Sequence, residues 1–401
     1  MKTKIQSFFQ KPAIKNLSSS LIAIFLGLLI GFIIMLIANS QNAVAGLGKM
    51  FKGAFNNPAG PVRGIGQLLY RSTPLIFTGL AIGFAFKTGL FNIGASGQYT
   101  MGIFGALLVA FLGGFLGILQ WPLAILVGAL FGAIWGSIPG ILKAFLNVHE
   151  VITSIMLNHI GVLFVNGILS TYYKGIIIDN ATNRSHPIPK NARNPFVGLD
   201  KVFPNSGADI GIILAIISVI IVYFILKKTV FGKELIAVGS NRHAAKYAGI
   251  NEKKSIILSM AISGFLAGLG GALFILAPSA RNLGNNYTLV NTILSQGFDG
   301  IPIALLANSH PIGILIAALF VQYISLGGQY MQSLGFKAEI VNVIIGVILY
   351  FSAFSLILGR SVTRLFKRKK KVNKDKPQEE VIKESDDTDS VETLELGGEV
   401  K

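Results

Sequence analysis

The stretch FGKELIAVGSNRHAAKYAGINEKK, residues 231–254, is a polar and basic interruption between two strongly apolar segments. Hydrophobic residues make up 52% of the 401 residues, and charged residues only 13%. A soluble domain carries roughly 25% charged residues, and the mean hydropathy here is +0.63. These values predict a polytopic membrane protein in which residues 231–254 join two membrane-spanning helices.

A helix needs about 20 apolar residues to cross the bilayer core. The expected fold is therefore an all-α polytopic membrane protein with about ten transmembrane helices. The first apolar segment is longer than the roughly 7–15 residues of a signal-peptide core, so it is interpreted as a retained anchor. The expected spans are residues 18–38, 68–87, 97–119, 122–146, 151–172, 209–226, 255–277, 287–307, 311–329 and 338–358.

The positive charge of the chain is placed as an orientation signal. The net charge is +17, but Lys and Arg gather at the ends of apolar segments, which favours cytoplasmic termini and argues against nucleic acid as a partner. We expect a cytoplasmic segment at 1–17, a transmembrane domain at 18–359 and an extracellular loop at 173–208. Residues 360–401 are first basic, which suits anionic membrane lipids, and then acidic without apolar periodicity, which predicts a disordered cytoplasmic tail.

Within residues 231–254 the sequence predicts a short helix with defined ends. Ser240 or Asn241 can cap it, because their side chains accept hydrogen bonds from the first free backbone N–H groups. The helix is expected to run over residues 242–248. Gly249 then provides a left-handed stop, and Ile250 the hydrophobic contact that commonly follows. Because so short a helix is not stable alone in water, we expect it to dock on a partner surface.

One face of this short helix is predicted to carry only small side chains. Asn241, Ala244, Ala245 and Ala248 fall on that face at helical spacing. A smooth face of this kind fits into a narrow groove on another protein. Ala245→Glu is therefore expected to abolish function without affecting membrane insertion.

Motifs for covalent chemistry are missing from the sequence. There is no G-x-x-x-x-G-K-[ST] phosphate loop and no G-x-S-x-G nucleophile motif. Cysteine is absent, and the five histidines show no metal-ligand spacing. No catalytic or metal-binding residue is assigned, and the chain is not expected to be an enzyme.

Polar side chains within apolar spans usually face a cavity or another helix. Glycines interrupt residues 87–102 around Asn92 and Gln98, which fits either a re-entrant turn beside a translocation path or a plain cytoplasmic turn. Asn158 lies about two turns into its span, so it either lines the path or makes an interhelical hydrogen bond. Glu150 is expected to be an exposed or N-terminal charge that suits the helix dipole.

A second interruption lies in the predicted span 287–307. Gly297, Gly300 and Pro302 break the helical pattern near its middle, and Asp299 sits at the break. Broken helices with a polar group at membrane depth commonly form transport sites. Asp299 is expected to cap the helix that follows it and also to line the path.

Four glycines recur at every fourth position of one span. Gly128, Gly132, Gly136 and Gly140 form a continuous seam of small residues along a single helix. Such a seam lets a second helix approach closely. We expect this approach to occur within the chain rather than at a dimer interface.

Four segments together resemble a known transporter family. They are TGLAIGFAFKTGLFNIGASGQ, VHEVITSIMLNHI, AVGSNRHAAKYAGI and GFDGIPIALLANSHP. The chain resembles, over residues 68–358, the membrane permeases of ABC importers for branched-chain amino acids, simple sugars and nucleosides. Among these it is most similar to the larger permease of bacterial nucleoside importers.

This resemblance implies that the short helix is the coupling helix that sits in a groove of a cytoplasmic ABC ATPase. It also implies a second permease subunit in a heterodimer, an extracellular substrate-binding lipoprotein and a location in the plasma membrane. ATP and Mg²⁺ would bind the ATPase, and no cofactor is expected on this chain. The implied coupling residues are Gly239, Ser240, Asn241, Arg242, Ala244, Ala245, Lys246, Ala248, Gly249 and Ile250.

The expected function is translocation of guanosine-like nucleosides by alternating access, driven by the partner ATPase. Simple sugars and branched-chain amino acids remain alternative substrates. A second alternative is an ion-coupled secondary transporter that uses Asp299 and Glu339, and a third is a membrane scaffold or receptor without transport. The expected path residues are Phe91, Asn92, Gln98, Asn158, Gln296, Phe298 and Asp299.

Overall fold

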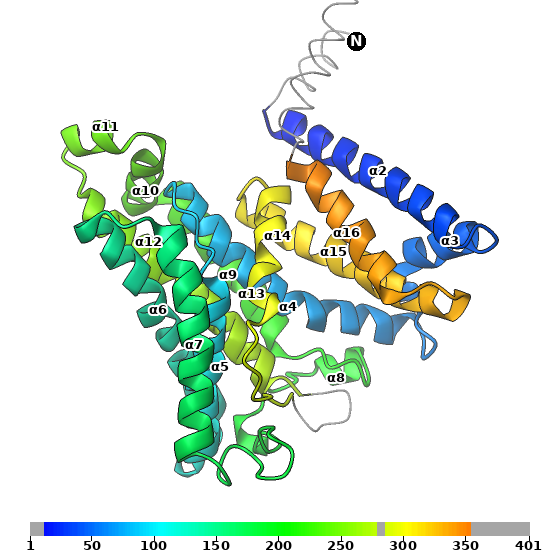
Figure 1. The fold of residues 1–401 in the computed structure, drawn as a ribbon, viewed down its shortest axis with the longest axis horizontal. Helices are drawn as coiled ribbons and strands as arrows, with labels where there is room; N and C mark the ends of the chain where they lie inside the picture. Colours follow the sequence, from blue (N-terminus) through cyan, green and yellow to red (C-terminus); the bar gives the residue numbers. More distant parts are fainter. Residues whose placement is uncertain (1–11, 279–284, 354–401) are drawn as a thin grey trace, which may run out of the picture. The chain divides into compact units, whose positions relative to one another are not determined.

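The computed structural model describes residues 12–278 and 285–353, and apart from isolated β-bridges its regular structure in these ranges is helical (Figure 1). The predicted tail at 360–401 and most of the predicted segment at 1–17 lie outside the described residues. The elements are α2 (Pro12–Ala38), α3 (Ala43–Lys52), η1 (Gly53–Asn56), α4 (Pro61–Lys87), α5 (Ala95–Leu112), η2 (Gly114–Leu119), α6 (Gln120–Leu146), α7 (Glu150–Tyr172), η3 (Lys190–Ala192), α8 (Leu199–Val202), α9 (Ile210–Lys228), α10 (Val230–Ser240), α11 (Arg242–Tyr247), α12 (Glu252–Leu276), α13 (Ser295–Phe298), α14 (Gly300–Leu306), α15 (Pro311–Met331), η4 (Gln332–Leu334) and α16 (Ala338–Ala353).

Among the described residues, seven helices are long and apolar enough to cross a membrane. They correspond to α4, α5, α6 with the preceding η2, α7, α9, α12, and α15 with the following η4. Shorter apolar helices cover Phe25–Ala38 and Ala338–Ile348, within the first and last predicted spans. The polytopic helical class is thus confirmed, whereas the count of ten remains a prediction.

The predicted interruption within the span at 287–307 is confirmed, although the irregular part also includes the start of the segment. The chain is irregular up to Leu294 and then forms two short helices, α13 and α14. Gly297 packs directly on the backbone of Ser96, and Gly300 packs on the backbone of Thr78. Because a helix with larger side chains could not approach α4 and α5 this closely, the glycines place the break against the neighbouring helices.

Side-chain caps set the boundaries of the helices around residues 231–254. Thr229 Oγ1 accepts a hydrogen bond from the Gly232 N–H (3.0 Å) at the start of α10. Asn241 Oδ1 accepts from the Ala244 N–H (3.0 Å) at the start of α11. At the start of α12, Asn251 Oδ1 accepts from the Lys254 N–H (3.0 Å). Capping by such side chains, worth about 1 kcal/mol each, divides this region into three helices.

The glycine seam packs against another helix of the same chain, as predicted. A Cβ atom on Gly136 would lie 2.7 Å from the Met260 carbonyl oxygen and 2.8 Å from Cα of Gly264. Gly132 meets the backbone of α12 in the same way, Gly140 packs on Met260 and Ile257 of α12, and Gly128 packs on the backbone of Gly102 in α5 and on the Ala272 side chain of α12. The two helices therefore contact each other backbone to backbone, which only glycine permits at this distance.

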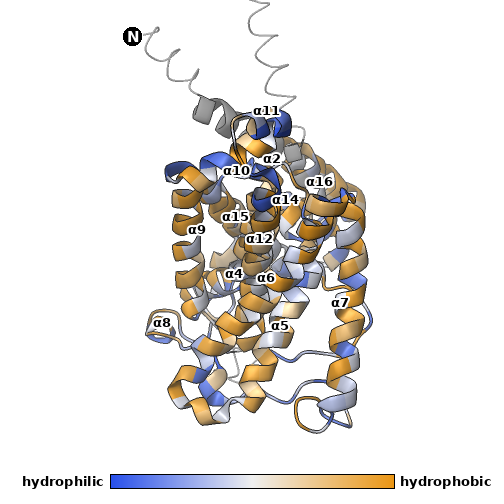
Figure 2. Ribbon diagram, turned by 90° about the vertical axis from the view of Figure 1, so that its left-hand side faces the viewer, coloured by the Kyte–Doolittle hydropathy of each residue, from blue (hydrophilic) through white to orange (hydrophobic). Residues whose placement is uncertain are grey.

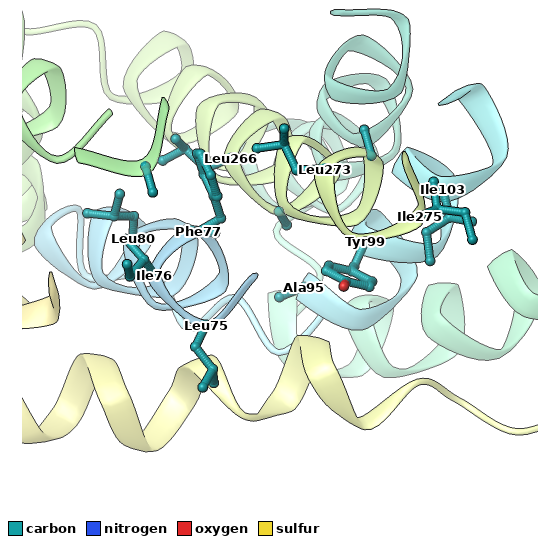
Figure 3. Packing of buried hydrophobic residues seen from close by; sticks show 14 of the residues in the cluster. Leu75, Ile76, Phe77, Leu80, Ala95, Tyr99, Ile103, Leu266, Leu273 and Ile275 are labelled. Carbon is teal, nitrogen blue, oxygen red and sulfur yellow. The ribbon is translucent and has the colours of Figure 1, made fainter. Parts of the chain in front are cut away.

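Clusters of buried apolar side chains stabilise the fold. The larger one lies between α4, α5 and α12, where Phe77, Tyr99 and Leu273 are fully or almost fully buried (Figure 3). A second cluster joins α2, α3, α15 and α16 around Met35 and Met50. The helices on either side of the larger cluster therefore hold fixed positions next to the site described below.

The polar loop at 173–208 is folded against a second segment. The Ser185 N–H donates to the Tyr287 carbonyl oxygen (2.8 Å), and the Leu289 N–H donates to the Asn183 carbonyl oxygen (3.0 Å). Within the loop, Asp179 accepts hydrogen bonds from the Ala181 N–H (3.0 Å) and the Thr182 hydroxyl (2.9 Å). These hydrogen bonds hold the pKa of Asp179 below its ordinary value.

Candidate functional site

The predicted coupling helix is present as α11, and its two ends are confirmed. Asn241 is the N-cap, whereas the Ser240 hydroxyl donates to the Ile236 carbonyl oxygen (2.9 Å) at the end of α10. Gly249 has φ of +82°, and the Ile250 N–H donates to the Ala245 carbonyl oxygen (3.0 Å). This pairing is the usual way in which a left-handed glycine closes a helix. Hydrophilic residues gather at α10 and α11 (Figure 2).

The predicted small face is divided between the interior and the surface. Ala244 and Ala248 are exposed, but Ala245 is only 4% exposed and packs inside the chain. Ala245→Glu would therefore disturb the packing of α11 itself, so loss of function in this variant would not by itself identify a docking surface. Sequence reasoning also missed Tyr247, whose side chain is 94% exposed on α11.

The charged residues of α11 face solvent. Lys246 is exposed. Arg242 lies 3.9 Å from the Glu252 carboxylate at the start of α12. An exposed ion pair of this length contributes little to stability, at most about 1 kcal/mol.

Three of the predicted path residues form a buried hydrogen-bond network. Asn92 Nδ2 donates to Gln98 Oε1 (2.8 Å) and to the Ser263 hydroxyl (2.7 Å). Asn158 Nδ2 donates to the Ile93 carbonyl oxygen (3.0 Å), and its Oδ1 accepts from the Gly97 N–H (2.7 Å). These hydrogen bonds hold the turn between α4 and α5 against α12 through Asn92 and against α7 through Asn158.

The two predicted aromatic residues belong to different segments of the chain. Phe91 stacks on Phe86, with ring centroids 5.4 Å apart and planes 7° apart. Phe298 ends α13 and is half-buried. Neither lines the polar cavity described next.

Gln296 and Asp299, in contrast, meet at a polar cavity of about 230 Å³. The cavity lies between α4, α12, α15 and the α13–α14 segment, and sequence reasoning missed most of its lining. The Gln296 side-chain oxygen is buried without a hydrogen-bond partner within the described part of the chain. The polar residues of the lining are Tyr70, Arg71, Thr73, Asp209, Gln296, Asp299, Gln322 and Ser325.

Asp299 does not cap α14, contrary to the prediction. Its backbone has φ of −60° and ψ of −19°, and its side chain makes no capping hydrogen bond. Its carboxylate is exposed, and the residue lines the cavity. The second carboxylate of the ion-coupled alternative, Glu339, is exposed at the start of α16 and does not line this cavity.

Glu150 carries the N-terminal charge of α7 that the sequence predicts, but it is not exposed. It begins α7, but it is only 7% exposed and its carboxylate lies 3.0 Å from Lys143 Nζ. It therefore links the start of α7 to the end of α6 rather than facing a path.

His310 lies just before α15, near Lys87 and Lys227. Burial lowers the pKa of His310, and the positive charges of Lys227 and Lys87 lower this pKa further.

Comparison with known proteins identifies the family. The pattern of the family described as "Branched-chain amino acid transport system / permease component" matches residues 64–353. The chain is 40% identical to the nucleoside ABC transporter permease protein NupB of Lactococcus lactis, over 84% of this chain and 91% of that protein. It is 37% identical to the guanosine ABC transporter permease protein NupP of Bacillus subtilis, over 88% of this chain and 98% of that protein.

A third relative, the nucleoside ABC transporter permease protein NupC of Lactococcus lactis, is 30% identical over 66% of this chain and 83% of its own length. No solved structure matches. The family match covers most of the chain, including nearly all of α4, all of α11 and every residue that lines the cavity. The chain therefore belongs to the family of permease components of branched-chain amino acid type transport systems.

Proposed function

We propose that this chain is the membrane-spanning permease subunit of an ATP-driven importer and that its substrates are nucleosides of the guanosine type. The observation that carries the proposal is similarity over nearly the full length to permeases named for nucleosides and guanosine. The chain itself supplies a channel between helices rather than covalent chemistry. ATP and Mg²⁺ would bind a partner ATPase, which docks on the exposed side of α11 around Ala244, Tyr247 and Ala248.

The polar cavity is the proposed point of contact with substrate. A guanosine-like molecule has N–H and O–H groups that can donate hydrogen bonds. The Asp299 carboxylate and the Gln296 side-chain oxygen, which has no partner within the described residues, can accept them. At about 230 Å³ the cavity is smaller than most ligand pockets, which measure roughly 300–1,000 Å³. It therefore suits brief contact during passage and would be completed by a second permease subunit.

The proposed assembly contains two different permeases. The relatives include two nucleoside permeases of one organism, NupB and NupC, both of which are similar to this chain. We propose a heterodimer with one such second permease, a cytoplasmic ATPase and an extracellular binding lipoprotein. Ten spans and cytoplasmic termini in the plasma membrane complete the proposal.

Reconstitution with the candidate partners tests this function. Proteoliposomes that hold both permeases and the ATPase, with the binding protein outside, are supplied with labelled guanosine, ribose or leucine. We expect ATP-dependent uptake of guanosine that unlabelled nucleosides compete away. Uptake of ribose alone would contradict the nucleoside proposal, and uptake without the ATPase that collapses with an ion gradient would contradict the ATP-driven one.

A further inference from the structure

The end of α10 rests on the turn between α4 and α5 (Figure 1). A Cβ atom on Gly239 would lie 2.5 Å from the Lys87 carbonyl oxygen and 2.8 Å from the Gly89 backbone nitrogen. A Cβ atom on Gly89, which has φ of +72°, would in turn lie 3.1 Å from Cα of Gly239. The two backbones are therefore in direct contact three residues before Arg242, the first residue of α11.

The same turn is tied to two other elements. The Thr88 and Ser259 hydroxyl groups share a buried hydrogen bond of 2.6 Å, which joins the turn to α12. Lys87 Nζ donates to the Asn308 carbonyl oxygen (3.2 Å), which joins it to the connection between α14 and α15. Lys87, Thr88, Gly89 and Gly239 are called the junction below.

The elements that meet at the junction also border the polar cavity at their other parts. Tyr70 and Arg71 of α4, Phe274 of α12 and Gln322 of α15 all line it. Asp299 immediately precedes α14 and lines it too. A displacement of α10 would therefore move the turn that ends α4, and through it α12 and the connection between α14 and α15. The first contact is packing of backbones, and the other two are hydrogen bonds.

We propose that the junction transmits movement of α11 on the ATPase to the helices around the cavity. This inference rests on the proposed function, since it requires an ATPase that moves α11. Packed interiors deform little, so a backbone-to-backbone contact passes a displacement on without absorbing it. A side chain at Gly239 would separate α10 from the turn and misplace α11 relative to α4.

Gly239→Ala is the decisive variant, because alanine is a better helix former than glycine and does not weaken α10 by itself. The added Cβ meets main-chain atoms, which cannot rotate away as a side chain can. The matched control is Gly167→Ala in α7, where no heavy atom lies within 4 Å of the added Cβ. Both variants are assembled with the same partners in proteoliposomes.

The readout is the amount of guanosine transported per ATP hydrolysed. For Gly239→Ala we expect ATP hydrolysis to continue while this ratio falls by about tenfold, and for Gly167→Ala we expect the wild-type ratio. Thr88→Val preserves shape but removes the hydrogen bond to Ser259, so the ratio should fall by about threefold. Thr88→Val also covers the case in which Gly239→Ala does not assemble, which gel filtration and thermal unfolding would show.

If Gly239→Ala assembles and its transport ratio is unchanged, the proposed role of the junction is wrong. If Gly239→Ala does not assemble, an unchanged ratio in Thr88→Val contradicts that role instead. This result is distinct from failure of the proposed function, which appears as absent ATP-dependent guanosine uptake in the wild-type complex. A parallel loss of transport in Gly167→Ala would also contradict the inference, because the effect would then not belong to the contact with the turn.

Discussion

At the scale of single residues, local signals were predictable and distant partners were not. Asn241 and Gly249 define the ends of α11 through bonds to residues at most five positions away, so their roles follow from the sequence. Asn158 instead bonds to Ile93 and Gly97, more than 60 positions away. Asp299 was expected to cap a helix, but it faces a cavity whose other walls come from distant parts of the chain.

The buried amide of Asn158 allows a test of its structural role. Asn158→Ala leaves the Gly97 N–H and the Ile93 carbonyl oxygen without this partner, which should cost about 1–3 kcal/mol of stability. We expect a lower thermal midpoint in detergent, whereas Asn180→Ala on the exposed loop should leave it unchanged. A wild-type midpoint combined with lost uptake would show that Asn158 belongs to the path instead.

The carboxylate of Asp299 allows a test of the cavity. Asp299→Asn keeps the size of the side chain but removes its charge, so a hydrogen bond to a charged group, worth about 1.5–3 kcal/mol, is weakened. We expect kcat/KM for guanosine uptake to fall about tenfold or more, with an unchanged thermal midpoint. Asp200→Asn, on the exposed loop helix α8, is the matched control. Equal uptake by the two variants would remove Asp299 from the path.

His310 predicts a pH dependence of stability. Because its pKa is lowered in the folded chain, the unfolded chain binds the proton more readily, near the ordinary pKa of about 6.5. Stability is therefore complete above that pH and falls as the pH drops through it. The thermal midpoint of wild type should decrease more between pH 7.5 and 5.5 than that of His310→Gln. Parallel decreases would contradict this assignment.

At the scale of elements, hydropathy located the long helices but not the short ones. The seven long apolar helices match predicted spans because about 20 apolar residues suffice as a signal. Helix α10 was missed because its residues are mixed in polarity, and its position depends on the contact between Gly239 and the turn after α4. The break within 287–307 was predicted from its glycines and Pro302, but the packing of these glycines on α4 and α5 was not, because those helices lie far away in sequence.

The proposed docking of an ATPase on α11 involves the exposed side of this helix, which a charge at Ala244 would test. Ala244→Glu places a charge on the exposed side, where burial without a partner in a docking groove would cost roughly 2–5 kcal/mol. We expect loss of ATPase association, measured by co-purification, with a wild-type thermal midpoint for the isolated permease. Ala181→Glu on the exposed loop at 173–208 should associate normally.

Ala245→Glu separates docking from folding on the same helix. Ala245 is buried within the chain, so the variant should lower the thermal midpoint of the isolated permease itself. Normal co-purification of Ala244→Glu would show that the ATPase docks elsewhere. An unaltered midpoint for Ala245→Glu would contradict the packing of α11 described above.

At the scale of the whole molecule, the sequence was sufficient for the class and the family but not for the cavity. Composition alone predicted a polytopic helical protein, and four motifs spread over the chain predicted an importer permease, in agreement with the relatives. The cavity combines residues from α4 to α15, and no local pattern reports such an arrangement. The ion-coupled alternative is weakened because Glu339 does not reach the cavity that Asp299 lines.

The central claim is that ATP hydrolysis on a partner, received at α11, drives nucleoside transport through this chain. The most direct measurement is ATP-dependent uptake of labelled guanosine by the complete complex with either wild-type permease or Ala244→Glu. We predict accumulation in the wild-type complex only when ATP and the ATPase are present, and none with Ala244→Glu. Guanosine uptake that persists without ATP, or that is equal in the two complexes, would contradict it.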